Sequence, residues 1–98
     1  MADVSVGLFV RLEAADGQSE ALAEFLRSAK ALVAQEPGTI VWYVLRFGPT
    51  TFGIFDAFAG EDGRQAHLAG AVAQGLADHP ELFGAPPSIE QVDVLASK

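Results

Sequence analysis

The stretch 39–58, TIVWYVLRFGPTTFGIFDAF, decides the fold. It contains two apolar runs rich in β-branched and aromatic residues, 39–47 and 51–58, on either side of a Gly-Pro turn at residues 48–50. Two such runs joined by a short turn predict a β-hairpin. Successive side chains of a strand point to opposite faces, and both runs are apolar in both phases. The predicted hairpin therefore needs apolar cover on both faces of its sheet.

The flanking segments predict two more strands and a set of helices. Residues 4–13 alternate between apolar and other side chains, which is typical of a strand, and residues 89–96 predict a last strand. Residues 22–33 have apolar side chains at helical spacing, and Pro37 ends that helix because the residue before a proline avoids helical geometry. Residues 60–76 predict two short helices, since Gly63, Gly70 and Gly75 would weaken one continuous helix.

The predicted order β-α-β-β-α-β is typical of an α+β, ferredoxin-like fold. We expect a four-stranded antiparallel sheet with the helices on one face, in a single domain over residues 1–98 with its core at about 4–96. Phe9 and one phase of each hairpin strand would line the other face. A second copy of the chain could cover that face, so the sequence predicts a homodimer closed as a dimeric α+β barrel.

Composition and charge exclude several classes of function. Thirteen acidic and six basic residues give a net charge of −7, and the bases are dispersed, so we expect neither nucleic-acid nor membrane partners. The absence of cysteine excludes disulfides and thiolate chemistry. The chain starts without a signal-peptide pattern, which predicts a cytoplasmic protein. His67 and His79 stand apart from any cluster with metal-ligand spacing, so we expect no metal.

Two titratable residues and one aromatic pair are the candidate functional side chains. His67 beside an apolar cavity could accept or donate a proton near neutral pH, although spacing alone favours a packing histidine bonded to the backbone. Asp56 is the one charge in its strand and needs a partner if buried. Arg11 or Arg46 would provide a structural ion pair.

Trp42 and Tyr43 are adjacent on one predicted strand, so they point to opposite faces of the sheet. Either ring could stack on a flat aromatic ligand. The alternative is that both belong to the core or to the dimer interface. The sequence leaves open which of the two faces a cavity.

Over about residues 4–96 the chain resembles the antibiotic biosynthesis monooxygenase family of small dimeric α+β barrels. The resemblance rests on Glu36-Pro37-Gly38 before the second strand, on the strand FGIFDAF at 52–58, and on Gln65-Ala66-His67-Leu68 in the following helix. In that strand Asp56 stands two residues before an aromatic residue, Phe58, where the family commonly has Trp.

The resemblance implies a cofactor-independent monooxygenase that oxidises a phenolic or quinol substrate with dioxygen. It implies His67 as the catalytic base or hydrogen-bond donor. The walls of the pocket would be Trp42 or Tyr43, Phe55, Phe58 and Phe83. The haem-degrading proteins of this fold use an Asn, and this chain has none, so haem is disfavoured. The alternatives are a non-catalytic dimeric module that binds a small molecule or a partner, and a small isomerase or decarboxylase of a related barrel family.

Overall fold

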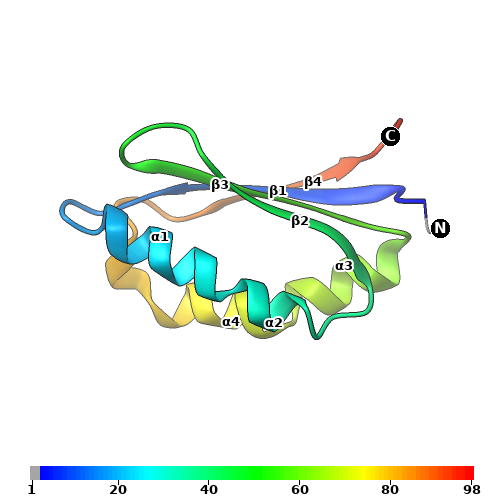
Figure 1. Cartoon of the computed structure of the whole chain (residues 1–98), viewed down its shortest axis with the longest axis horizontal. Coiled ribbons are helices and arrows are strands. Elements are labelled where there is room, and N and C mark those ends of the chain that lie inside the picture. The colour runs from blue at the N-terminus through cyan, green and yellow to red at the C-terminus, as the bar shows by residue number, and fades with distance from the viewer. Residues whose placement is uncertain (1–2) are drawn as a thin grey trace.

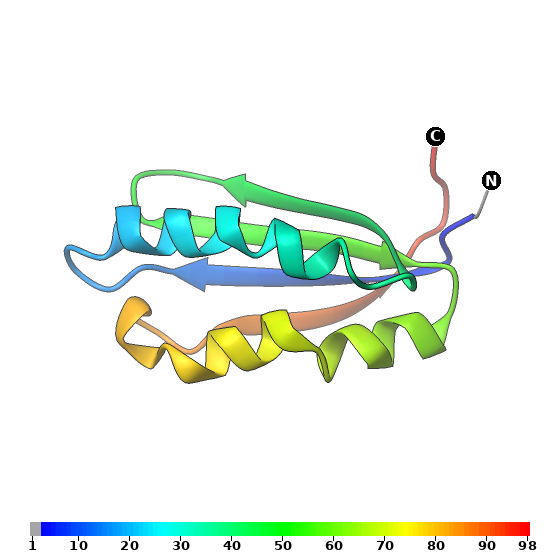
Figure 2. The same ribbon diagram turned by 60° about the horizontal axis from the view of Figure 1, so that its bottom comes forward.

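A computed structural model describes residues 3–98 (Figure 1). The elements in chain order are β1 (Val6–Glu13), α1 (Ser19–Ser28), α2 (Lys30–Val33), β2 (Thr39–Arg46), β3 (Thr51–Phe58), α3 (Glu61–Leu68), α4 (Ala71–Asp78), the 3₁₀ turn η1 (Pro80–Leu82) and β4 (Ser88–Asp93). The strands form one antiparallel sheet in the order β2-β3-β1-β4. Figures 1 and 2 show all the helices on one face of this sheet, which confirms the predicted fold class.

Among the element boundaries that differ from the prediction, two have a cause that the structure shows. The helix expected over 22–33 is divided at Ala29 into α1 and α2. Ser28 donates a side-chain hydrogen bond to the carbonyl oxygen of Phe25 at 2.7 Å, a type of contact that often bends helices. The last strand ends at Asp93 and not at residue 96, because its partner strand β1 begins at Val6, opposite Asp93.

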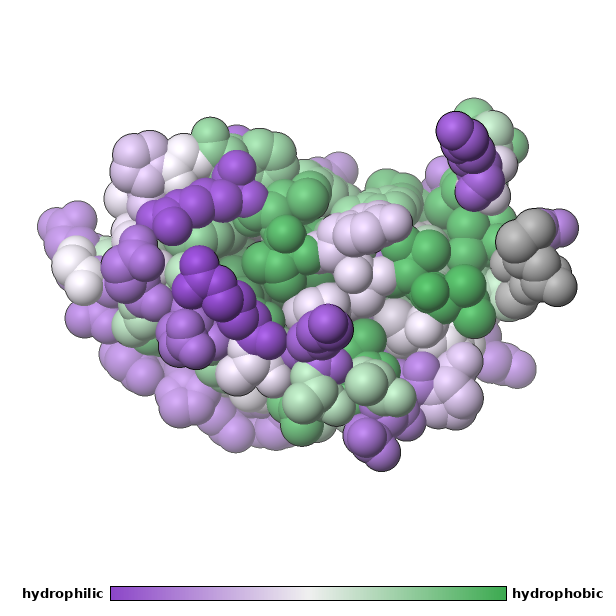
Figure 3. Space-filling view, in the orientation of Figure 1, coloured by the Kyte–Doolittle hydropathy of each residue, from purple (hydrophilic) through white to green (hydrophobic). Residues whose placement is uncertain are grey.

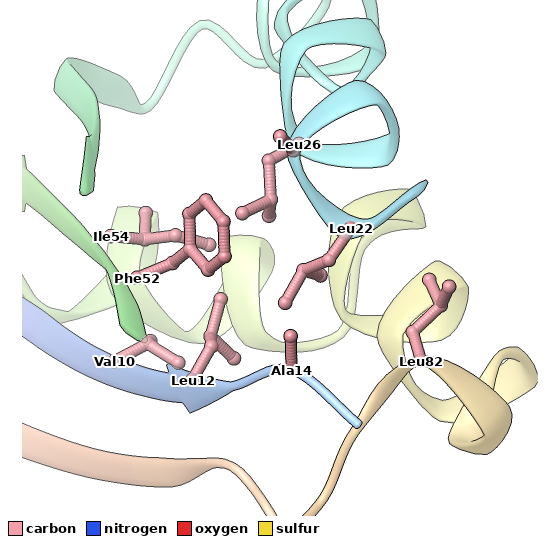
Figure 4. Packing of buried hydrophobic residues seen from close by; sticks show 9 residues of the cluster. Val10, Leu12, Ala14, Leu22, Leu26, Phe52, Ile54 and Leu82 are labelled. Carbon is pink, nitrogen blue, oxygen red and sulfur yellow. The ribbon is translucent and has the colours of Figure 1, made fainter. Parts of the chain in front are cut away.

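The main core lies between the sheet and α1, with η1 at one end (Figure 4). Leu12, Leu22 and Leu26 are fully buried there against Phe52 of β3. Full burial of each such side chain stabilises the fold by about 1.5–3 kcal/mol. A smaller cluster involves α2 and α4, and Trp42 packs against both clusters. The helix-covered face thus holds most of the interior.

The opposite face of the sheet carries aromatic side chains and no helix. Tyr43, Phe55 and Phe9 pair in register across β2, β3 and β1, so their side chains form one row. Tyr43 is 59% exposed and the nearby Phe47 is 50% exposed. Figure 3 shows hydrophobic residues gathered above the sheet, between the β2–β3 turn and the C-terminal end. We call the face defined by Phe9, Tyr43, Phe47 and Phe55 the bare face.

No helix within residues 3–98 is long and apolar enough to cross a membrane.

Candidate active site

A contact between two glycines places α3 against the loop that precedes β2. A Cβ atom on Gly63 would lie 2.8 Å from the carbonyl oxygen of Gly38, and a Cβ on Gly38 would lie 2.9 Å from the Cα of Gly63. Real Cβ atoms do not approach other heavy atoms so closely, so both positions require glycine for this contact. The contact brings Glu36, which lies in the same loop, to His67 on α3.

His67 lies between two carboxylates. Its Nδ1 is 2.6 Å from Oε1 of Glu36, and its Nε2 is 3.0 Å from Oδ2 of Asp56 on β3. Thr39 donates a further hydrogen bond to the same Glu36 oxygen at 2.7 Å. The side chains of Asp56, His67 and Glu36 are 1%, 8% and 20% exposed. We call these three residues the Asp-His-Glu trio.

The trio corrects the expected partners of both titratable residues. His67 contacts two side chains and not the backbone, and Asp56 pairs with His67 and not with arginine. The Arg11 side chain points to the opposite face of the sheet from Asp56, and it lies over the ring of Phe47 on the bare face. Arg46 lies near the end of β2, where it pairs with exposed Glu20 at 3.0 Å.

The carboxylates keep His67 protonated. Burial by itself lowers the pKa of an imidazole, but the neighbouring Asp56 and Glu36 carboxylates outweigh burial and raise the pKa of His67 to about 9. At neutral pH the ring is therefore an imidazolium and not a free base, and its Nδ1–H donates a hydrogen bond to Glu36. With both carboxylates ionised, the trio carries one negative charge in excess.

Asp56 and His67 line a small, otherwise apolar cavity between the sheet and the helices α3 and α4. The cavity measures about 30 Å³ and we call it the inner cavity. Its lining residues are Leu8, Val10, Ile54, Asp56, His67, Leu68, Val72, Ala73, Leu76 and Ile89. Neither carboxylate oxygen of Asp56 accepts an aligned hydrogen bond from residues 3–98, so the 3.0 Å contact with His67 is an ion pair only. A water needs roughly 10–15 Å³, so the inner cavity can admit one polar group of a ligand.

A larger groove lies next to the inner cavity. It measures about 440 Å³, within the roughly 300–1,000 Å³ usual for small-molecule sites. The groove, which we call the outer groove, is lined by Leu76, Ala77, Pro80, Phe83, Gly84, Ala85, Pro86 and Pro87. Leu76 of α4 is the one described residue that lines both spaces. The sequence signal for this groove is the Pro- and Gly-rich segment 84–87, which the sequence analysis did not use.

No protein-family model matches the sequence, and no curated protein matches it. Among solved structures, the chain is 54% identical to NE2512, a protein of unknown function from Nitrosomonas europaea, with a TM-score of 0.95. The match covers 97% of this chain and 93% of that one. The chain belongs to the family of NE2512.

Two further solved structures connect this relative of NE2512 to a named fold. A candidate antibiotic biosynthesis monooxygenase from Nitrosomonas europaea is 20% identical, with a TM-score of 0.83 over 93% of this chain and 99% of that one. Another from Caulobacter crescentus is 18% identical, with a TM-score of 0.81 over 95% of this chain and 92% of that one. The resemblance to the antibiotic biosynthesis monooxygenases is thus confirmed in the fold.

In this relative of NE2512 the expected pocket residues lie on two sides of the sheet. Phe58 and Trp42 are on the helix-covered face, and the Phe58 ring centroid is 5.5 Å from that of His67. Phe83 lines the outer groove. Tyr43 and Phe55 belong to the bare face, so they do not line the cavity beside His67.

The open question about Trp42 and Tyr43 is thereby answered: Trp42 faces the helices. Its ring packs between the two core clusters, and its Nε1 is buried without a hydrogen-bond partner among the described residues. Trp42 does not line the inner cavity or the outer groove. Across residues 3–98, no group of three or more His, Asp or Glu side chains has the geometry of a metal site.

Proposed function

We propose that the protein is a cofactor-independent monooxygenase that oxidises a phenolic or quinol substrate with dioxygen beside His67. The observation that carries the proposal is the buried Asp56–His67 ion pair in the lining of an otherwise apolar cavity. A histidine with a strongly perturbed pKa in such a place is a common feature of active sites. The fold shared with candidate antibiotic biosynthesis monooxygenases supports the same conclusion.

The reaction needs an electron-rich anion and a dry environment. Loss of the phenolic proton gives an anion that can reduce dioxygen directly. In the balance for an anthrone-type phenol, a ring CH₂ becomes C=O, one oxygen atom remains in the product and the other leaves as water. The substrate supplies all four electrons, so the reaction needs no external reductant. The imidazolium of His67 would stabilise the phenolate, since its charge is held in place before the reaction begins.

The outer groove would hold the body of the substrate. It is large enough for a fused aromatic ring system, and Phe83 provides an aromatic wall. The phenolic oxygen would pass Leu76 and enter the inner cavity. Movement of the Leu76 side chain is thus part of the proposal, because Leu76 is the residue that the linings of both spaces share.

We also propose that the protein acts as a homodimer joined through the bare face. The row of Phe9, Phe55 and Tyr43 gives each copy an aromatic surface, and a two-fold axis would bring two such rows together. The helix-covered cavity lies on the other side of the sheet. Each protomer would therefore keep its own site.

The test is oxygen consumption by the purified protein with anthrone-type phenols and naphthoquinols. We expect turnover by the wild type and a loss of at least about tenfold in kcat/KM for His67→Gln. His79→Gln is the matched control, because His79 is the other histidine and is exposed. Absence of oxygen consumption with every such substrate would refute the proposed activity. Equal rates in His67→Gln and wild type would remove His67 from the mechanism.

The size of the inner cavity favours a second candidate function, a non-catalytic dimeric module that binds small molecules. At about 30 Å³ the inner cavity cannot hold an aromatic ring, whereas the outer groove can. A ligand held only in the outer groove would not reach His67. Calorimetric binding of naphthols without any oxygen consumption would favour this alternative.

A further inference from the structure

The three members of the Asp-His-Glu trio lie in a row that runs from the interior of the protein towards its surface. Asp56 is essentially buried, His67 is 8% exposed and Glu36 is 20% exposed. Each contacts the next, at 3.0 Å and 2.6 Å. Of the three, Asp56 and His67 line the inner cavity, and Glu36 does not. A ligand in the cavity can therefore meet only the first two.

The hydrogen-bonding capacity of these two residues differs. Both ring nitrogens of His67 already face carboxylates, so the ring can bind a ligand only by giving up one of those contacts. Both carboxylate oxygens of Asp56 lack an aligned hydrogen bond from the described residues, and each can accept one. A buried acceptor without a donor is costly, and a ligand O–H would remove that cost.

We infer that Asp56 contacts the substrate and takes its phenolic proton, and that Glu36 is a positioning residue that holds His67 beside the resulting phenolate. The inference rests on the proposed function and assigns the base within that site. The O–H bond of the phenol breaks, its electron pair stays on the phenolate oxygen, and the proton forms a new O–H bond on Asp56. Negative charge thus moves from Asp56 to the substrate, within reach of the same imidazolium.

This assignment follows from charge as well as from contacts. His67 is already protonated at neutral pH, so it cannot accept a further proton. Glu36 receives the Nδ1 hydrogen bond and is kept in place by Thr39. A neutral residue at position 36 would lower the pKa of His67, because the Glu36 carboxylate helps to raise it. The imidazolium would then lose its proton more easily, and the phenolate would lose its stabilising charge.

The first experiment follows the proton and does not depend on turnover. A chromogenic phenol such as 4-nitrophenol is bound anaerobically at a pH below its own pKa, where its anion is recognised by its absorbance. An indicator dye in weak buffer reports any proton released. We expect the wild type to bind the phenolate form with no proton release, because Asp56 keeps the proton. Release of one proton for each phenolate bound would overturn the inference.

Variants provide the second experiment. We expect Asp56→Asn to lose the phenolate spectrum and to lower kcat by about a hundredfold or more, with Glu24→Gln on the exposed face of α1 as the unaffected control. We expect Glu36→Gln to shift the alkaline limb of the pH–rate profile to lower pH by at least one unit, a change that a purely structural role would not produce. An Asp56→Asn variant that is folded by circular dichroism and retains both kcat and the phenolate spectrum would overturn the inference.

Failure of the inference can be distinguished from failure of the proposed function. Oxygen consumption by the wild type together with proton release on binding would leave the oxygenase in place and remove Asp56 as the base. Binding of the phenolate form without proton release and without oxygen consumption would support Asp56 and refute the oxygenase. If Asp56→Asn does not fold, the proton count on the wild type decides alone.

Discussion

The stability of the protein should fall steeply between pH 6 and pH 9 because of His67. The pKa of His67 is about 9 in the folded chain, compared with 6.5 for an ordinary histidine. The gap from 6.5 to about 9, at about 1.4 kcal/mol for each pH unit, corresponds to about 3 kcal/mol. The His67 side chain is only 8% exposed, so solvent screening reduces this figure little. Such a contribution is large beside a typical total stability of about 5–15 kcal/mol.

The direction follows from the raised pKa. A group that binds its proton more tightly in the folded state stabilises that state. The stabilisation is fully present at any pH below the pKa that the group has in the unfolded chain. The contribution of His67 is therefore fully present below pH 6.5 and is lost as the pH rises through about 9. We expect the free energy of unfolding to be about 3 kcal/mol lower at pH 9.5 than at pH 6.

Urea unfolding at a series of pH values measures this change. Trp42 is the single tryptophan and packs against the core, so its fluorescence reports unfolding. His67→Gln should unfold with nearly the same free energy across the range, whereas the control His79→Gln should retain the fall. A flat profile in the wild type would refute the reasoning, as would an unchanged slope in His67→Gln.

Three further changes test other parts of the structure. Gly63→Ala should destabilise the fold by about 1–3 kcal/mol in urea unfolding, because its Cβ would meet the Gly38 carbonyl. A change from Gly to Ala inside a helix usually stabilises it. A higher free energy of unfolding in this variant would therefore contradict the contact. Phe55→Asp should convert the proposed homodimer to a monomer in light scattering, and an unchanged mass would exclude the bare face as the interface. Leu76→Ala should join the outer groove to the inner cavity and raise the affinity for naphthols severalfold in calorimetry. The lost side chain should lower the free energy of unfolding by about 1–3 kcal/mol. Unchanged affinity would show that Leu76 does not control entry.

The architecture could be predicted because the phase of each strand determines which side chains share a face. Asp56 alternates with Phe52, Ile54 and Phe58, and the structure places all four on the helix-covered face. The same alternation leaves Phe55 on the bare face. In contrast, residues 40–45 form an unbroken apolar run without alternation. The position of Trp42 depends on an irregularity between Thr39 and Val41, which periodicity does not reveal.

The trio could be predicted only in part. Both Asp56 and His67 stand out in the sequence as candidates, but the sequence does not pair them, because the distance between them depends on how α3 packs against β3. Glu36 lies 31 residues before His67, and in the sequence it stands out only as part of the Glu-Pro-Gly segment that ends a helix and contributes to the family resemblance. Its contact with His67 requires the backbones at Gly38 and Gly63 to touch. Nothing in the spacing of a single sequence indicates that two glycines in different elements meet.

The two faces of the sheet differ in a way that stability alone does not explain. On the bare face the aromatic row contributes apolar surface that a second copy can bury, which is favourable without any specific chemistry. On the covered face, a hydrophobic side chain at position 56 would match its neighbours Ile54 and Phe58. Replacing a buried ion pair with well-packed hydrophobic residues is often neutral or stabilising, and here the carboxylate of Asp56 also lacks an aligned hydrogen bond. A charge placed at such a cost, beside a cavity that adjoins a groove of ligand size, is better explained by the chemistry it performs than by the fold it supports.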